Sequence, residues 1–263
     1  MRHSTPARPV AATDQDARSL LVRHQCPTPF HVVRALFMGA IASPRLEVSP
    51  LGALAQIWGG EMPEFTSQEE VEDVVGVLVQ GLWNRLADHQ PLRNPFRLTR
   101  FDVTPTRQAL HDLAWLRTQE LEGFVDGLFG PDHEMMLPER AHDAVQALAE
   151  LHAMFTDTAK FLADEEKPAQ PQDLKTLLHT LQQMAIVADE RINKAVQACK
   201  RRRLQQLKAM GTGPSRRTLS FGRRNPDASG VPGHKHDQEK IQGQQEQDQE
   251  HEQPERHGPW LVG

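Results

Sequence analysis

An internal duplication is the feature that most constrains the fold of this chain. Gly39 is followed eleven residues later by Pro50, and the same arrangement recurs as Gly127 and Pro138. The same offset matches four further pairs of small or apolar residues: Leu36 with Phe124, Ile41 with Phe129, Ala53 with Ala141, and Ile57 with Val145. Because the apolar positions recur at helical spacing, we expect two copies of one helix-turn-helix unit.

The two glycines stand inside apolar stretches that the pattern predicts to be helical. Glycine in a helix interior costs about 1 kcal/mol relative to alanine, so we expect a close contact between helices to offset that cost. Ala35 lies four residues before Gly39, and Gly123 lies four before Gly127, so each helix offers a groove of small residues for packing. Access of a ligand to the backbone is the alternative, but no glycine-rich phosphate-binding motif accompanies either glycine.

Helix signals extend over the central part of the chain, and no alternating apolar run indicates a strand. Four expected helix starts combine a Ser or Thr N-cap with proline or glutamate: Thr28-Pro29, Ser49-Pro50, Ser67 with Glu70, and Thr104-Pro105. We therefore predict an all-α fold. The two helix-turn-helix units form a helical domain over residues 17–165, a long helix covers 171–210, and disordered segments cover 1–16 and 211–263.

The net charge of −5 conceals three blocks of different sign. Residues 191–226 hold eleven Lys or Arg and no acid, whereas residues 227–263 hold eight acids and three bases. The rest of the chain therefore carries a net charge of −11. An acidic domain followed by a basic segment and an acidic, Gln-rich tail is typical of chains with interaction arms.

The motifs give no indication of an enzyme. Thirteen histidines are present, but they follow no metal-binding spacing, and neither a nucleophile motif nor a phosphate loop occurs. Asp132-His133-Glu134 falls in an expected turn and is interpreted as a solvated loop. The two cysteines, Cys26 and Cys199, lie far apart, so neither a disulfide scaffold nor a cysteine-rich zinc site is supported. We predict no catalytic residue, no cofactor and no metal ligand.

Hydropathy gives no sign of a secretory or membrane segment. Residues 1–16 lack the apolar stretch of a signal peptide. The most hydrophobic run, over residues 30–42, contains His31 and Arg34 and is too short to cross a bilayer. We therefore expect a cytoplasmic protein that does not contact membranes.

The helix expected after Pro171 carries a heptad-like seam of apolar residues, in which spacings of four and three alternate. The seam consists of Leu174, Leu178, Leu181, Ala185, Ala188, Ile192, Ala195 and Cys199. Alanine at several of these positions makes a weak seam for an isolated two-stranded coiled coil. Docking onto the domain is therefore favoured, and dimerisation or binding of a partner helix is the alternative.

The same helix ends in a cluster of cations, and further arginines follow it in the tail. The candidate polyanion-binding residues are Lys200, Arg201, Arg202, Arg203, Lys208, Arg216, Arg217, Arg223 and Arg224. Such side chains neutralise phosphates of RNA or DNA. Solvation at a helix end, where cations complement the helix dipole, or contact with acidic protein surfaces is the alternative.

Several structural motifs carry a resemblance to a known family. They are Phe37-Met38-Gly39-Ala40-Ile41-Ala42-Ser43-Pro44, Pro50, Ile57-Trp58-Gly59, Phe65, Glu69-Glu70 and Trp83-Asn84, echoed by Glu122-Gly123-Phe124-Val125-Asp126-Gly127. Over about residues 30–160 the chain resembles the YecA/YgfB-type family of bacterial proteins. The resemblance implies an all-helical cytoplasmic protein that self-associates and for which no general activity is established.

Departures from the family pattern mark this chain as divergent. Arg34-Ala35 stands where family members often have His-Gly, and Glu120-Leu121 stands where an approach containing Trp is common. Some relatives end in a Cys-rich zinc segment, but no such cluster follows Cys199, so that metal site is not carried over.

These observations favour a non-enzymatic protein-interaction or regulatory protein whose partner is an unidentified protein or a second copy of the chain. The alternative is a nucleic-acid- or ribosome-associated factor that binds phosphates through the basic segment 191–226.

Overall fold

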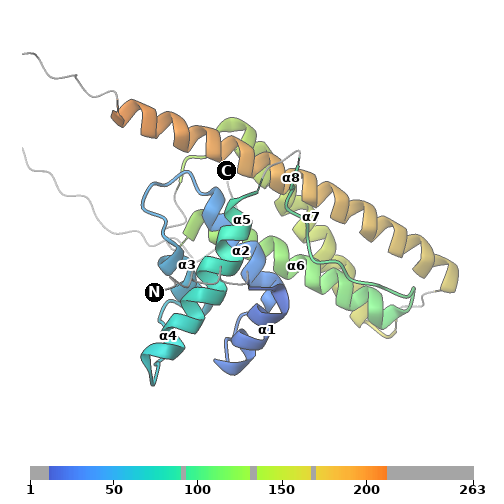
Figure 1. The fold of residues 1–263 in the computed structure, drawn as a ribbon. Coiled ribbons are helices and arrows are strands. Elements are labelled where there is room, and N and C mark those ends of the chain that lie inside the picture. The colour runs from blue at the N-terminus through green and yellow to red at the C-terminus, as the bar shows by residue number, and fades with distance from the viewer. Residues whose placement is uncertain (1–11, 90–92, 131–134, 167–169, 212–263) are drawn as a thin grey trace, which may run out of the picture.

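The computed structural model describes residues 12–89, 93–130, 135–166 and 170–211. All regular elements in that part of the chain are helices (Figure 1). They are α1 (Asp14–Arg23), α2 (Phe30–Ala42), α3 (Pro50–Ile57), α4 (Gln68–Val74), η1 (Val75–Trp83), α5 (Asn84–Ala87), α6 (Arg107–Phe129), α7 (Glu139–Ala163) and α8 (Pro171–Gly211). The elements α4, η1 and α5 form one continuous helix with a π-helical middle. The prediction of an all-α fold with a long final helix is confirmed.

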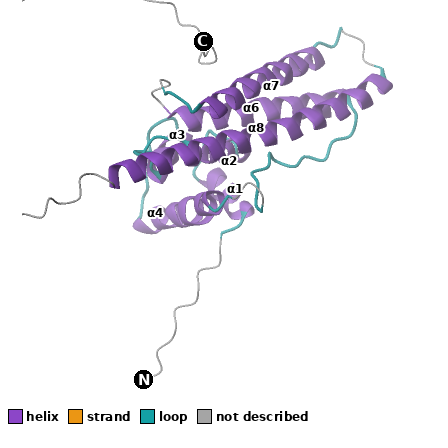
Figure 2. Ribbon diagram, turned by 90° about the horizontal axis from the view of Figure 1, so that it is seen from above, coloured by secondary structure: helices purple, strands orange, loops and turns teal. Residues whose placement is uncertain are grey.

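The pair of helices α2 and α6 lies at the centre of the fold, with one group of helices packed beside α6 and another beside α2. The long helices α6, α7 and α8 run side by side, and α2 packs against α6 (Figure 2). Helix α1 and the continuous helix from α4 to α5 cover α2 on the side away from α7. Because nearly every helix contributes to one cluster of buried side chains, the described helices share one core.

Two of the expected helix caps are present. The Ser49 hydroxyl accepts a hydrogen bond from the Gly52 backbone N–H at 3.1 Å, at the start of α3. The Ser67 hydroxyl accepts from the Glu70 N–H at 3.3 Å, at the start of α4. The Glu70 carboxylate accepts from the Thr66 N–H at 2.8 Å, which satisfies a backbone donor just before the helix.

Three helix starts differ from the expectation. Helix α6 begins at Arg107, not at Thr104-Pro105, because Thr106 is its N-cap and the Thr106 hydroxyl accepts from the Ala109 N–H at 3.3 Å. Helix α1 begins inside the N-terminal segment that was expected to be disordered, because Thr13 and Asp16 form a capping box. Thr28 does not cap α2, because its hydroxyl donates to the Ile57 carbonyl at 2.6 Å, and Pro29 takes the N-cap position instead. The hydrogen bond of Thr28 joins residues far apart in the chain, so local propensity does not reveal it.

The two internal glycines lie at the contact between α2 and α6. A methyl group on Gly39 would collide with the Phe124 carbonyl and lie 2.7 Å from the Leu128 nitrogen. A methyl group on Gly127 would collide with the Leu36 carbonyl and lie 3.0 Å from the Ala40 nitrogen. The absence of a side chain therefore lets the two backbones approach. The expected close helix contact is confirmed.

The contacts along α2 and α6 are reciprocal. Gly123 approaches the Val32 carbonyl and Gly127 approaches the Leu36 carbonyl, so the contact advances four residues on both helices and the two helices run in the same direction. All eight matched residues of the duplication are buried: Leu36, Phe124, Ile41, Phe129, Ala53, Ala141, Ile57 and Val145.

Helix α8 docks on the body along its apolar seam. Five seam residues are buried: Leu181, Ala188, Ile192, Ala195 and Cys199. The helix packs along α7 and also contacts α6 and α2. The seam is therefore occupied within the chain, as expected for docking and not for an open coiled-coil face.

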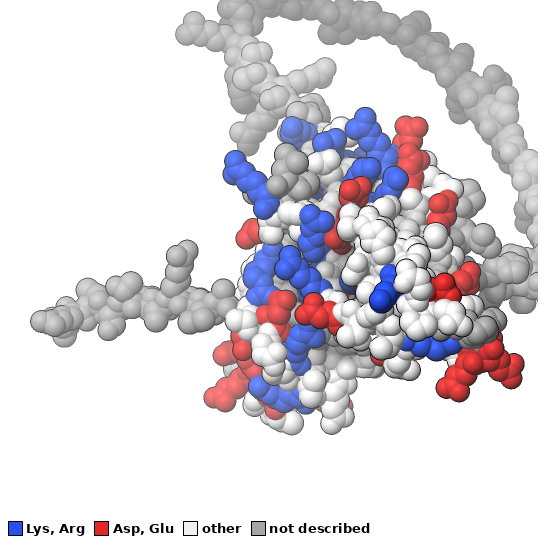
Figure 3. Space-filling model, turned by 90° about the vertical axis from the view of Figure 1, so that its right-hand side faces the viewer, with Lys and Arg blue, Asp and Glu red and all other residues white. Residues whose placement is uncertain are grey.

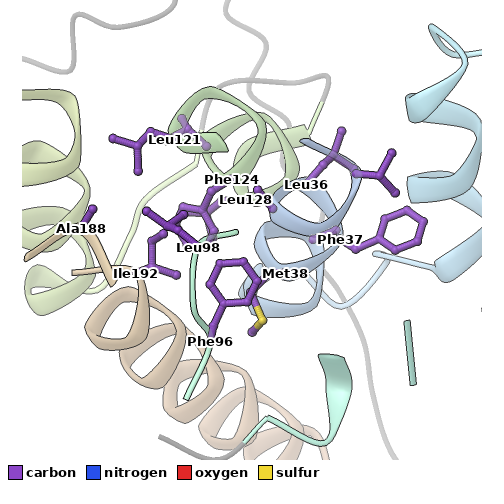
Figure 4. Close-up of a cluster of buried hydrophobic side chains, with 14 of the residues drawn as sticks. Leu36, Phe37, Met38, Phe96, Leu98, Leu121, Phe124, Leu128, Ala188 and Ile192 are labelled. Carbon is purple, nitrogen blue, oxygen red and sulfur yellow. The ribbon is translucent and has the colours of Figure 1, made fainter. Parts of the chain in front are cut away.

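The extended stretch between α5 and α6 lies between α2, α6 and α8. Figure 4 shows Phe96 and Leu98 of this stretch among the buried side chains of those helices. The Asn193 side-chain amide of α8 pairs with the Phe96 N–H and C=O, both at 3.0 Å. The Asp189 carboxylate accepts from the Leu98 N–H at 2.8 Å. Side chains of α8 thus satisfy backbone groups that have no helix or sheet partner.

Candidate functional site

The structure divides the predicted polyanion-binding residues into three sets. Arg216, Arg217, Arg223 and Arg224 lie outside the described residues. The others lie on the last third of α8, where Lys200 and Arg203 are partly buried and Arg201, Arg202 and Lys208 are exposed. The cluster therefore presents an inner and an outer face.

Lys200 and Arg203 point toward the body and bind the C-terminal ends of other helices. Arg203 donates to the backbone carbonyls of Ile41 and Ser43, at 2.9 and 3.2 Å, where α2 ends. The Lys200 ammonium lies 3.5 Å from the carbonyls of Ala87 and His89, just after α5. Burial lowers the pKa of both cations. These two side chains complement helix dipoles, so their role is structural.

The two faces predict different responses to mutation. Arg203→Ala removes two charge-assisted hydrogen bonds and is expected to lower the free energy of unfolding by about 1.5–3 kcal/mol. Arg202→Ala is the matched control and is expected to stay within about 0.5 kcal/mol of the parent chain, because its side chain is exposed. Urea denaturation of the full chain measures both. Equal effects of the two substitutions would contradict the assignment of faces.

Arg201 and Arg202 face outward and line a groove between α8 and the first turn of α7. The groove consists of two hollows of about 460 and 320 Å3 that share Arg140, Ala198 and Arg201. We call it the basic groove, because its walls carry five cations: Arg140, Arg191, Lys194, Arg201 and Arg202. Arg140 was not a candidate from the sequence because it lies far from the basic segment in the chain, and Arg191 and Lys194 were included only within the basic segment 191–226.

Within the described part of the chain, ion pairs do not neutralise the cations of the basic groove. The structure gives none of the five a salt bridge to a described residue, although Glu139 and Asp143 also line the groove. The Nε atom of Arg191 is buried and has no hydrogen-bond partner among those residues. Figure 3, in which the right-hand side of Figure 1 faces the viewer, shows Lys and Arg side chains gathered toward one side of the body and bordered by acidic ones.

Among the residues that the structure describes, Arg117 and Glu120 are the most buried Arg, Lys, Asp or Glu side chains, with 6 and 1% of their surface exposed. They form an ion pair with each other. The Glu120 carboxylate also accepts from the Thr99 N–H at 2.7 Å, and the Arg117 guanidinium donates to the Thr99 carbonyl at 2.7 Å. Their polar groups hold the stretch before α6 in place, so the pair is structural.

The histidines form no metal site in the part of the chain that the structure describes, where no group of three His, Cys, Asp or Glu side chains converges. His89 packs against α8, where its ring lies 2.6 Å from the Asn193 amide oxygen and burial lowers its pKa. The expected loop Asp132-His133-Glu134 lies outside the described residues.

Another hollow lies beside the turn from α2 to α3. It has a volume of about 940 Å3, and its walls are mostly small residues together with Arg45, Glu47 and Gln56. Gly127 borders it, but the contact with Leu36 already accounts for that glycine. Among the described residues that line this hollow, no cluster of titratable groups converges.

Cys199 is a buried thiol, and burial raises its pKa to about 12. A thiol is nucleophilic only when ionised, so Cys199 is expected to be inert in the folded protein. A Cys26→Ser variant leaves it as the single cysteine. At pH 8, a thiol-specific chromogenic reagent should leave this variant unlabelled in native buffer and label it in denaturant. Rapid labelling in native buffer would contradict the burial of the α8 seam.

Comparisons with family models, curated proteins and solved structures found no match for this chain. Among the described helices, none combines the length and apolar character that a membrane span requires.

Proposed function

We propose that this chain is a non-enzymatic protein-interaction or regulatory protein of the YecA/YgfB type that acts in the cytoplasm. The family-like motifs support the assignment. The contacts of Gly39 with Phe124 and of Gly127 with Leu36 support two related helix-turn-helix units. Each glycine contacts the residue that corresponds to Leu36 or Phe124 in the other copy. The unit beginning with α6 has the longer second helix, so the copies have diverged.

The observation that carries this proposal is an apolar face at the end of α8. Leu204, Leu207 and Met210 are 58, 49 and 60% exposed and stand three residues apart. This spacing places them along one face of the helix. Figure 1 shows that the end of α8 extends beyond the other helices. An apolar helix face of this kind binds in a hydrophobic groove of a partner protein.

Affinity purification from native cell extract tests the proposal, with nuclease treatment before elution. The full chain is compared with a Leu204→Gln/Leu207→Gln variant and with a Met154→Gln control, which alters an exposed apolar residue of α7. We expect one specific protein to remain bound to the parent chain and the control and to be lost from the double variant. Identical recovery with all three chains would contradict binding through α8.

The second candidate is a nucleic-acid- or ribosome-associated factor that binds phosphates through the basic segment 191–226. The specific observation in its favour is that Arg201 and Arg202 face outward and have no ion pair with a described residue. In the same purification, bound material that disappears on nuclease treatment would favour this candidate over the first.

A further inference from the structure

We infer that the basic groove between α7 and α8 binds the phosphates of nucleic acid. The inference rests on the second candidate function and assigns its site. The site differs from the cluster of cations predicted from the sequence. It excludes Lys200 and Arg203, which bind the carbonyl groups at helix ends, and it includes Arg140 from α7.

The first argument is the local balance of charge. The chain carries a net charge of −5, so it has no general attraction for polyanions. The groove concentrates five cations against two acidic residues, Glu139 and Asp143. Cations held close together without ion pairs raise the local concentration of an anionic ligand.

The second argument is the linear arrangement of the cations. Arg191, Lys194, Arg201 and Arg202 follow one another along α8. At a rise of 1.5 Å per residue, the span from Arg191 to Arg202 is about 16 Å. A line of this length suits a polymer with regularly spaced charges better than a single small anion. Four of the five groove cations are arginines, whose forked guanidinium binds phosphate oxygens in pairs.

The third argument is the start of α7 at the wall of the groove. Pro138, Glu139 and Arg140 line the larger hollow. Pro138 is the N-cap residue and makes no side-chain hydrogen bond to the first turn. The backbone N–H groups of that turn are therefore not capped by this side chain, and the positive end of the helix dipole adds to the field of the arginines.

Fluorescence anisotropy of the full chain with a labelled 20-nucleotide single-stranded oligouridine tests the inference. The groove variant is Arg140→Ala/Arg201→Ala/Arg202→Ala. The control variant is Arg93→Ala/Lys160→Ala/Lys175→Ala, which removes the same charge from exposed sites outside the groove.

Each phosphate contact contributes about −0.7 to the slope of log affinity against log salt for a single strand. The groove variant is therefore expected to lose about 2 from the magnitude of the slope and to bind at least about tenfold more weakly at low salt. The control should retain the slope of the parent chain.

The contrary outcomes separate the site from the function. If Arg216→Ala/Arg217→Ala/Arg223→Ala/Arg224→Ala abolishes binding while the groove variant binds like the control, the assignment to the groove is overturned and the second candidate function stands. If the full chain does not bind the oligonucleotide even at low salt, both are overturned.

Discussion

Replacing Gly39 or Gly127 with alanine is expected to destabilise the fold by about 3 kcal/mol, the upper end of the usual cost of overpacking. The added methyl group meets backbone atoms of the opposing helix, which cannot move aside as a flexible side chain can. Either α2 and α6 separate, or their shared core repacks. Urea denaturation of the full chain, followed by circular dichroism, measures the loss.

Gly76→Ala is the matched control for this prediction. Gly76 also lies in a helix, but a methyl group there meets nothing within 4 Å. Alanine favours the helix over glycine by about 1 kcal/mol, so this variant should be as stable as the parent chain or more stable. If the Gly39 and Gly127 variants behaved like the Gly76 variant, the close approach of α2 and α6 would be wrong.

Replacing Glu120 with alanine is also expected to lower the free energy of unfolding by several kcal/mol. Glu120→Ala leaves the buried Arg117 charge without its carboxylate partner and the Thr99 N–H without its acceptor. Breaking a buried ion pair on one side costs about 3–5 kcal/mol. The unfolding free energy in urea should fall by that amount.

Glu150→Ala provides the control, because Glu150 is an exposed glutamate on α7. Its removal should change stability by less than about 0.5 kcal/mol. A small effect of Glu120→Ala, close to that of the control, would show that the stretch before α6 is not held by this pair.

The helical architecture could be predicted from local sequence. The serine caps at Ser49 and Ser67, the apolar periodicity and the repeated glycine–proline spacing are readable within short windows, whereas the caps expected at Thr28 and Thr104 are wrong. Gly39 and Gly127 lie at the close helix contact that the repeat implied. The seam of α8 was also readable, because Ile192 and Ala195 recur at helical spacing and are buried.

The polar interactions could not be predicted because they join residues far apart in the chain. Nothing near Asn193 indicates that its amide binds the backbone of Phe96, and nothing near Arg203 indicates that it binds the end of α2. The basic groove could not be predicted for the same reason, because Arg140 and Arg201 are brought together only by the packing of α8 along α7. A count of cations in the sequence does not distinguish Lys200 and Arg203, which face the body, from Arg201 and Arg202, which face solvent.

Amide hydrogen exchange of the full chain, resolved along α8, tests the central claim that this helix belongs to the folded body. We expect residues 181–203 to exchange as slowly as α2 and α6, because their inward face is buried, and protection to fall after Arg203, where the helix leaves the body. Fast exchange along the whole of α8, with α2 and α6 still protected, would contradict the docking of α8 and with it the basic groove.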